Sequence, residues 1–225
     1  MNSTYLLIII IGVVGLIVQG RLQSVFNKYS RVRFPGGYTG KDVAERMLHD
    51  HGIYDVKVVA TRGHLTDHYN PATRTVNLSE SVYSSPSMAA AAVAAHECGH
   101  AVQHAQGYAP LRLRSSLVPV IQFSSALSTW VVILGIVLIN SFPAIFWVGI
   151  AMIAASALFA VVTLPVEYNA SARALAWLEG TGMVSPEEMK GARVPLRWAA
   201  RTYLVAALSA IATLIYYLGF ARNND

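Results

Sequence analysis

The longest uncharged stretch of the sequence runs from Ser115 to Val166 and contains no Asp, Glu, Lys or Arg. A membrane-spanning helix needs about 20 predominantly apolar residues, so this stretch is long enough for two. The segment Asn140-Ser141-Phe142-Pro143 divides it, and such a segment is typical of a helix end followed by a new helix start. We therefore predict a transmembrane helical hairpin over residues 118–164, with helices near 118–139 and 143–164.

Two further apolar segments lie at the ends of the chain. Residues 1–20 carry no charged side chain and lack the basic start and small-residue cleavage site of a signal peptide. We predict an uncleaved transmembrane anchor there, with a signal peptide as the alternative. Residues 201–225 supply a fourth helix and a short tail. With 54% hydrophobic and 13% charged residues, the chain is too apolar for a soluble protein of 225 residues. The predicted fold class is a mainly α membrane protein with about four transmembrane helices.

The basic residues are concentrated in two segments. Four spans place residues 21–117 and 165–200 on the same side of the membrane, and these segments hold 15 of the 17 Lys and Arg residues. The positive-inside rule assigns both to the cytoplasm and both termini to the outside. The net charge of +5 is thereby explained without a nucleic-acid partner. We expect a multi-pass protein of a prokaryotic plasma membrane, with the lipid bilayer as its partner.

Residues 21–117 have the pattern of a small α+β unit. Thr39 is a candidate cap for a helix that runs to about His51, and Gly52 is its stop. Residues 55–61 and 74–78 are β-rich and predict a hairpin or a short sheet, in which 74–78 is a candidate edge strand for an extended substrate. Pro86-Ser87 precedes a long alanine-rich helix, 88–106, which Gly107 ends. Residues 165–200 form a second water-facing, helical segment.

The alanine-rich helix carries the motif His96-Glu97-Cys98-Gly99-His100, which is H-E-x-x-H. Positions i and i+4 share one face of a helix, so the two imidazoles can bind one Zn²⁺ ion. Glu97 lies about 100° around the helix from His96, as expected of a base that takes a proton from a metal-bound water. The alternative is a partly buried polar patch with two ordinary histidines.

A catalytic zinc site needs a third protein ligand. Our candidate is Glu167, the first charged residue after the long apolar stretch, at the start of an amphipathic helix. A carboxylate there is costly unless it is paired, and Arg173 is an alternative partner for it. Ser171 shares the face of Glu167 and can reach a ligand histidine. The competing ligands are Asp67, Glu80, His64 and His68.

Two neighbouring side chains are not expected to bind the metal. His104 follows His100 by four positions, but three histidines at i, i+4 and i+8 of a straight helix cannot converge on one ion, so we predict packing or solvent exposure for it. Cys98 points to another face and is predicted to be a small buried residue. Asp67-His68-Tyr69 has two interpretations, a rim of the active-site cleft or turn residues that bond the local backbone.

Three stretches make the sequence resemble the neutral zinc metallopeptidase family of YugP-like membrane proteases, and more distantly the HtpX-type and CAAX prenyl protease gluzincins. They are 63–71, 94–103 and 164–175. The resemblance implies a zincin-like fold for residues 21–117, His96, His100 and Glu167 as zinc ligands, and Glu97 as the base. The gluzincins usually carry Asp four residues after the ligand Glu, where this chain has Ser171.

The predicted function is a membrane zinc endopeptidase that cleaves protein or peptide substrates, which include membrane proteins, at the cytoplasmic membrane face. Two alternatives remain. An intramembrane, site-2-type protease would need its H-E-x-x-H inside a spanning segment, and residues 88–106 are too polar in their C-terminal half. A non-catalytic metal-binding scaffold would normally have four protein ligands, and only three are identified.

Overall fold

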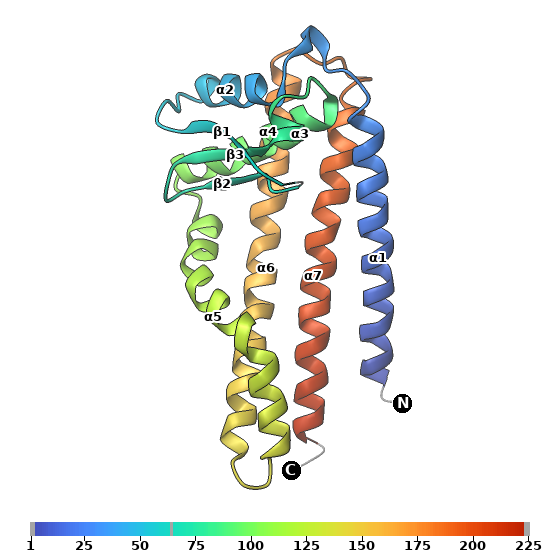
Figure 1. Ribbon diagram of the computed structural model, residues 1–225, viewed down its shortest axis with the longest axis vertical. Helices are drawn as coiled ribbons and strands as arrows, with labels where there is room; N and C mark the ends of the chain where they lie inside the picture. Colours follow the sequence, from blue (N-terminus) through green and yellow to red (C-terminus); the bar gives the residue numbers. More distant parts are fainter. Residues whose placement is uncertain (1–2, 64, 223–225) are drawn as a thin grey trace. The chain divides into compact units, whose positions relative to one another are not determined.

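The computed structural model describes residues 3–63 and 65–222. Its helices are α1 (Ser3–Tyr29), a 3₁₀ turn η1 (Pro35–Gly37), α2 (Gly40–Asp50), α3 (Glu80–Tyr83), α4 (Met88–Ala105), α5 (Ala109–Val137), α6 (Pro143–Gly180) and α7 (Lys190–Arg222), and its strands are β1 (Lys57–Thr61), β2 (His68–Asn70) and β3 (Thr75–Ser79) (Figure 1). The chain divides into two compact units. The apolar unit comprises Met1–Ile17, Arg112–Pro165 and Thr202–Asp225, and the mixed unit comprises Val18–Leu111 and Val166–Arg201.

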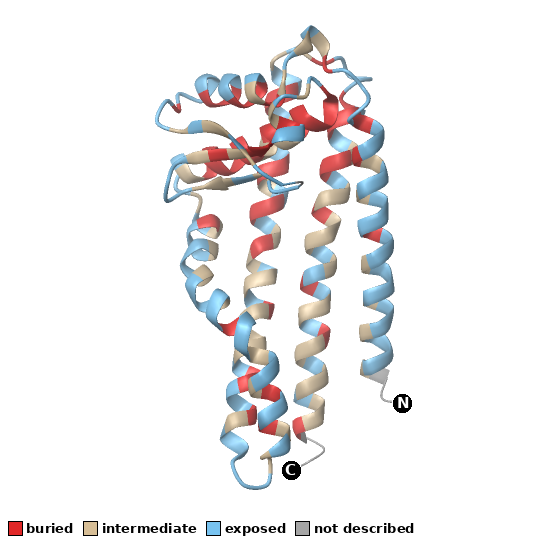
Figure 2. Ribbon diagram, viewed as in Figure 1, coloured by how far each residue is buried: buried red, intermediate tan, exposed pale blue. Residues whose placement is uncertain are grey.

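The apolar unit is built from parts of α1, α5, α6 and α7. These are the four helices of the described residues that are long and apolar enough to cross a membrane. Most of their large apolar side chains are exposed, and Figure 2 shows these helices mainly in the colours of exposed and intermediate residues. Apolar side chains that face outward along such helices need lipid around them. The predicted mainly α membrane protein is therefore confirmed.

Within the apolar unit, α5 and α6 approach closely. Val132, Phe146 and Ile150 form a small buried cluster. A β-carbon on Gly135 would lie 2.5 Å from the Cα of Phe146, so only glycine fits at this crossing. The chain turns between Val137 and Pro143, as the interruption in the apolar stretch predicts.

The long helices extend beyond the predicted spanning segments. The predicted limits lie near the first charged residues, but a charge does not by itself end a helix. α6 continues through Pro165 to Gly180. Glu167 therefore lies inside a long helix and does not start a new one.

The sheet of the mixed unit has the strand order β1-β3-β2. β1 pairs with β3 in parallel, with Val58 opposite Val76, and β2 pairs with β3 in the antiparallel sense. The short sheet is confirmed, but residues 55–61 and 74–78 do not form a hairpin. The prediction that 74–78 is an edge strand is wrong, because β3 is central, and its Val76 and Leu78 are fully buried.

Helix α4 is the core of the mixed unit and contacts α2, α3, β2 and β3. Alanines on nearly every face let these elements pack close to its backbone, and Figure 2 shows α4 mostly as buried. Its predicted ends are confirmed: the Ser87 side chain accepts a hydrogen bond from the Ala90 N–H, and Gly107 has a φ of 63°. The predicted cap of α2 is confirmed as well, with Thr39 and Asp42 forming a capping box.

Candidate metal centre

The two histidines of the motif lie side by side on α4. Their ring centroids are 4.8 Å apart, and the ring planes are inclined by 83°. His100 is buried, and His96 is partly buried. The spacing of four residues therefore brings both Nε2 atoms to one side of the helix, as the motif predicts.

Gly99, between the two histidines, sets the distance from α4 to α6. A β-carbon at Gly99 would lie 2.5 Å from the carbonyl oxygen of Ala170, and backbone atoms cannot give way as a flexible side chain can. The missing side chain lets the two helices pack almost backbone to backbone. Glu167 and Ser171, which flank Ala170 on α6, are thereby brought to the histidines of α4.

The carboxylate of Glu167 completes a group of three possible metal ligands. Its Oε2 lies 3.2 Å from His96 Nε2 and 3.6 Å from His100 Nε2, and all three donor atoms lie within 4.8 Å of one another. A tetrahedral zinc ion with ligands at about 2.0–2.2 Å separates its donor atoms by about 3.4 Å. The donor set of two imidazoles and one carboxylate, with these separations, fits a zinc ion.

Each histidine uses its second ring nitrogen for a hydrogen bond within the protein. His96 Nδ1 lies 3.1 Å from Ser171 Oγ, and His100 Nδ1 lies 3.0 Å from Gln103 Oε1. Ser171 thus contacts a histidine at the position where the wider gluzincins have Asp. Such partners orient an imidazole so that its Nε2 faces the metal.

The acidic groups of the centre change the proton affinity of His100. Burial by itself would lower the pKa of His100, but the interaction with Glu167 and the negative charges of Glu97 and Glu167 outweigh it, and the pKa is raised above its ordinary value. A bound proton and a bound metal ion would therefore compete for this imidazole.

Glu97 is held by the backbone of β2. Its Oε2 accepts a hydrogen bond of 3.0 Å from the Tyr69 N–H, while β2 pairs with β3 through its other edge. The carboxylate of Glu97 is nearly buried, at 8% exposure, but is not one of the three clustered donors. The structure thus separates Glu97 from the three ligand candidates and fixes its orientation through a strand that the sequence pattern did not reveal.

The Asp67-His68-Tyr69 segment contacts the centre, and the turn interpretation holds for the neighbouring Asn70 but not for Asp67. Tyr69 reaches the centre through its backbone, and Asn70 Oδ1 accepts hydrogen bonds from Ala72 and Thr73 as a turn residue does. Among the described residues, Asp67 bonds across the sheet and not to the local backbone. Its carboxylate accepts hydrogen bonds from the N–H and the hydroxyl of Ser79, which joins the start of β2 to the end of β3.

The competing ligand candidates among the described residues bond to partners other than the clustered donors. Asp67 is bonded to Ser79, His68 Nδ1 lies 2.8 Å from the Thr66 carbonyl oxygen, and Glu80 accepts a hydrogen bond from Ser84. His64 lies outside the described residues. Among the described residues, the group with suitable geometry is the one formed by the predicted ligands, namely His96, His100 and Glu167.

The remaining residues singled out in the sequence are accounted for by packing and hydrogen bonds. Arg173, the alternative partner predicted for Glu167, uses its Nε and Nη1 to donate to Asn169 and Gln106. Cys98 is fully buried as predicted, and burial raises the pKa of its thiol, which keeps it protonated and unreactive. His104 packs against Tyr69, with its Nδ1 2.7 Å from the phenolic oxygen.

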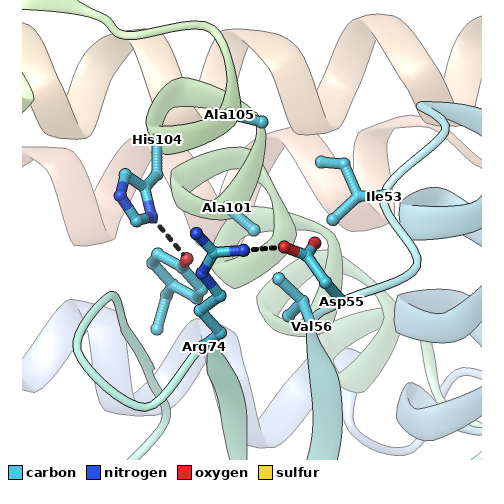
Figure 3. Close-up of a pocket in the computed structure, with 8 residues that line it drawn as sticks. Ile53, Asp55, Val56, Arg74, Ala101, His104 and Ala105 are labelled. Carbon is cyan, nitrogen blue, oxygen red and sulfur yellow. Dashed lines mark hydrogen bonds and ion pairs between the residues drawn. The ribbon is translucent and has the colours of Figure 1, made fainter.

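A pocket of about 340 Å³ adjoins the C-terminal half of α4. It is lined by Ile53, Asp55, Val56, Tyr69, Arg74, Ala101, His104 and Ala105. Figure 3 shows the Arg74 side chain between His104 and Asp55, with the Arg74–Asp55 ion pair at one end. None of the three clustered metal donors lines this pocket, whereas Tyr69, whose N–H bonds to Glu97, does.

A helix with paired histidines, a separate carboxylate from a second helix and an adjacent oriented glutamate defines the class of mononuclear zinc metallopeptidase centres. Residues 4–222 match the family described as "Putative neutral zinc metallopeptidase". The chain is also 41% identical over 206 residues to the "Putative membrane protease YugP" of Bacillus subtilis (strain 168), a match that covers 92% of this chain and 91% of that protein. No solved structure matches the chain. The chain belongs to this neutral zinc metallopeptidase family, which confirms the resemblance seen in the sequence and implies Zn²⁺ as its cofactor.

Proposed function

We propose that the protein is a zinc-dependent endopeptidase of the membrane that cleaves protein or peptide substrates at the cytoplasmic membrane face. The observation that carries this proposal is the position of Glu97. It lies beside a complete three-ligand group, is not a member of it, and is held by the Tyr69 N–H. A site that only stored metal would have no use for a second, separately oriented carboxylate beside the three ligands.

His96, His100 and Glu167 would hold the zinc ion, with Glu97 as the general base. When bound, zinc lowers the pKa of a water molecule toward neutrality and polarises the peptide carbonyl. Glu97 accepts a proton from the attacking water and delivers it to the leaving amine. The Tyr69 N–H donates to Oε2 of Glu97, so the other carboxylate oxygen would take the proton.

Both alternative functions have less support. An intramembrane protease would carry its motif on a spanning helix, whereas α4 is not one of the four candidate spanning helices in the described residues. A structural zinc scaffold would have a fourth protein ligand, and the clustered group of the described residues has three. Three ligands leave one position open for water and substrate.

The proposal predicts a metal-dependent cleavage activity. Purified full-length protein should contain about one zinc ion per chain and cleave casein. A chelator should abolish both the zinc content and the cleavage, and added zinc should restore them. Zinc-loaded protein that never cleaves casein or membrane-fraction proteins would favour the scaffold, and cleavage that survives complete zinc removal would contradict the proposal.

The cytoplasmic orientation rests on charge. The water-facing segments 21–117 and 165–200 hold 15 of the 17 basic residues. The test uses a Cys98→Ser background, in which the serine hydroxyl can replace the thiol that donates to the Ala44 carbonyl oxygen. Single cysteines introduced into it should show which side of the membrane each segment faces. A cysteine at Ser141, between α5 and α6, should react with an impermeant thiol reagent on intact cells. Cysteines at Ser30 and Glu187 should react only after lysis, and reaction at Ser30 on intact cells would reverse the assignment.

A further inference from the structure

Gln103 is a fully buried amide that contacts two parts of the proposed zinc site. Its Oε1 lies 3.0 Å from His100 Nδ1, on the side of the imidazole that faces away from Glu167. Its Nε2 donates hydrogen bonds of 2.8 Å to the Val166 carbonyl oxygen and of 3.0 Å to Asn169 Oδ1. A buried amide with all these partners is fixed in position and cannot turn to water.

The partners of Gln103 also determine which end of the amide faces His100. The Val166 carbonyl oxygen can only accept a hydrogen bond, so the NH₂ end must face α6. Asn169 is oriented in the same way, because Arg173 Nε, which can only donate, lies 2.7 Å from Asn169 Oδ1. Both acceptors on α6 therefore require a donor from Gln103. The oxygen of Gln103 is left to face His100.

An oxygen at that position determines the tautomer of the neutral imidazole. Gln103 Oε1 accepts a hydrogen bond from an N–H at Nδ1 but would meet a lone pair in the other tautomer. The competing acceptor, Glu167 Oε2, lies 3.6 Å from Nε2, beyond hydrogen-bond range, whereas Gln103 Oε1 lies 3.0 Å from Nδ1. The geometry therefore favours the proton of neutral His100 on Nδ1. Its Nε2, 3.6 Å from Glu167 Oε2, keeps the lone pair that a metal ion requires.

The second contact of Gln103 links this effect to the third ligand. Val166, whose carbonyl accepts from Gln103, directly precedes Glu167 on α6. One side chain thus connects the helix that carries His100 with the backbone next to Glu167. Arg173 anchors the same connection at its far end through Asn169 and through Gln106 Oε1 at the C-cap of α4.

We propose that Gln103 is a positioning residue for the zinc site, which holds His100 in the Nδ1–H tautomer and ties its helix to the segment of α6 that carries Glu167. This inference rests on the proposed role of His100 as a zinc ligand. Sequence analysis did not identify Gln103, although it lies three positions after His100 and seven after His96, on the face of α4 that carries both.

The test uses Gln103→Met, which keeps the length of the side chain but removes its polar atoms. Zinc affinity of the full-length protein, measured by competition with a chromophoric chelator, should fall about 10–100-fold, as is usual when such a partner of a ligand is lost. Gln23→Met is the matched control, because Gln23 belongs to the same unit, is exposed and donates to Asn27, which is neither a ligand nor a partner of Gln103. Its zinc affinity should stay near that of the wild type.

A second measurement reads the tautomer directly and needs no metal. In zinc-free protein labelled with ¹⁵N-histidine, the two-bond ¹H–¹⁵N correlations distinguish Nδ1–H from Nε2–H imidazole. The spectrum is recorded at alkaline pH, where the imidazole is neutral and carries a single N–H. A His100→Asn variant identifies the signal. Wild-type His100 should show the Nδ1–H pattern, and Gln103→Met should shift it toward the other tautomer.

An Nε2–H pattern in the wild type would overturn the inference, and so would an unchanged tautomer and zinc affinity in Gln103→Met. If Gln103→Met does not fold, the wild-type tautomer decides by itself. Failure of the proposed function would look different, because the wild-type protein would then bind no zinc at this site whichever tautomer His100 adopts.

Discussion

Replacing Glu97 by Gln is expected to lower the rate of peptide cleavage by a factor of 10² to 10⁴ or more and to leave about one zinc ion per chain. Gln has the shape of Glu, and its amide oxygen can still accept the hydrogen bond from the Tyr69 N–H. It cannot take a proton from water, however, so the loss should be confined to the chemical step. The measurement is kcat/KM for a casein-derived peptide, with metal content determined on the same preparation.

The matched control for Glu97→Gln is Glu80→Gln. Glu80 is a carboxylate of the same unit, exposed at the start of α3 and bonded to Ser84, away from the clustered donors. Its loss should change neither cleavage nor zinc content. Near wild-type cleavage by Glu97→Gln would refute the role of Glu97 as base. Loss of zinc together with activity would instead make Glu97 a ligand.

Helix α4 shows how far local sequence determines this site. A serine cap, a run of alanines, the i and i+4 histidines and a terminal glycine are all short-range features, and each is found where the sequence predicts it. The identity of the family, its zinc cofactor and the mainly α membrane fold follow from equally local patterns. Such features can be predicted because they depend on neighbours within one or two helical turns.

The environment of Glu97 could not be predicted in this way. β2 has only three residues, His68–Asn70, too few to show an alternating pattern. Its neighbour β3 proved to be the central strand, since it pairs with β1 in parallel and with β2 on the other side. Strand order depends on contacts across the whole unit. The hydrogen bond from Tyr69 to Glu97 is therefore a property of the tertiary structure alone.

The packing of α4 against α6 also depends on residues that are far apart in the sequence. Gly99 and Ala170 are far apart in the sequence, and neither stands out by itself among the many small residues of these helices. Their close approach is a property of the folded structure, in which a β-carbon at Gly99 would collide with the Ala170 carbonyl oxygen. Glu167 was a candidate because a carboxylate at that position needs a partner, but its partners could not be deduced from spacing.

Replacing Glu167 by Ala is expected to remove tightly bound zinc and cleavage activity together. The Glu167 carboxylate is almost fully buried, at 2% exposure, and its Oε2 lies within 3.6 Å of both histidine Nε2 atoms. It offsets one charge of a dication in a partly dehydrated site, and removing it leaves two neutral imidazoles as ligands. Zinc content after gel filtration and chelator competition measure the first loss, and the casein assay measures the second.

A companion variant and two controls separate the loss of a ligand from general damage to the fold. Glu167→Gln keeps the volume of the buried side chain, so weakened zinc binding in a folded protein would show that the charge is what matters. Glu179→Ala, on the same helix but in an exposed pair with Arg193, and Glu187→Ala should bind zinc normally. If Glu167→Ala instead retains stoichiometric zinc while Asp67→Ala releases it, the third ligand lies in the segment between β1 and β3. The Glu167 carboxylate would then be only a hydrogen-bond partner of His96 and His100.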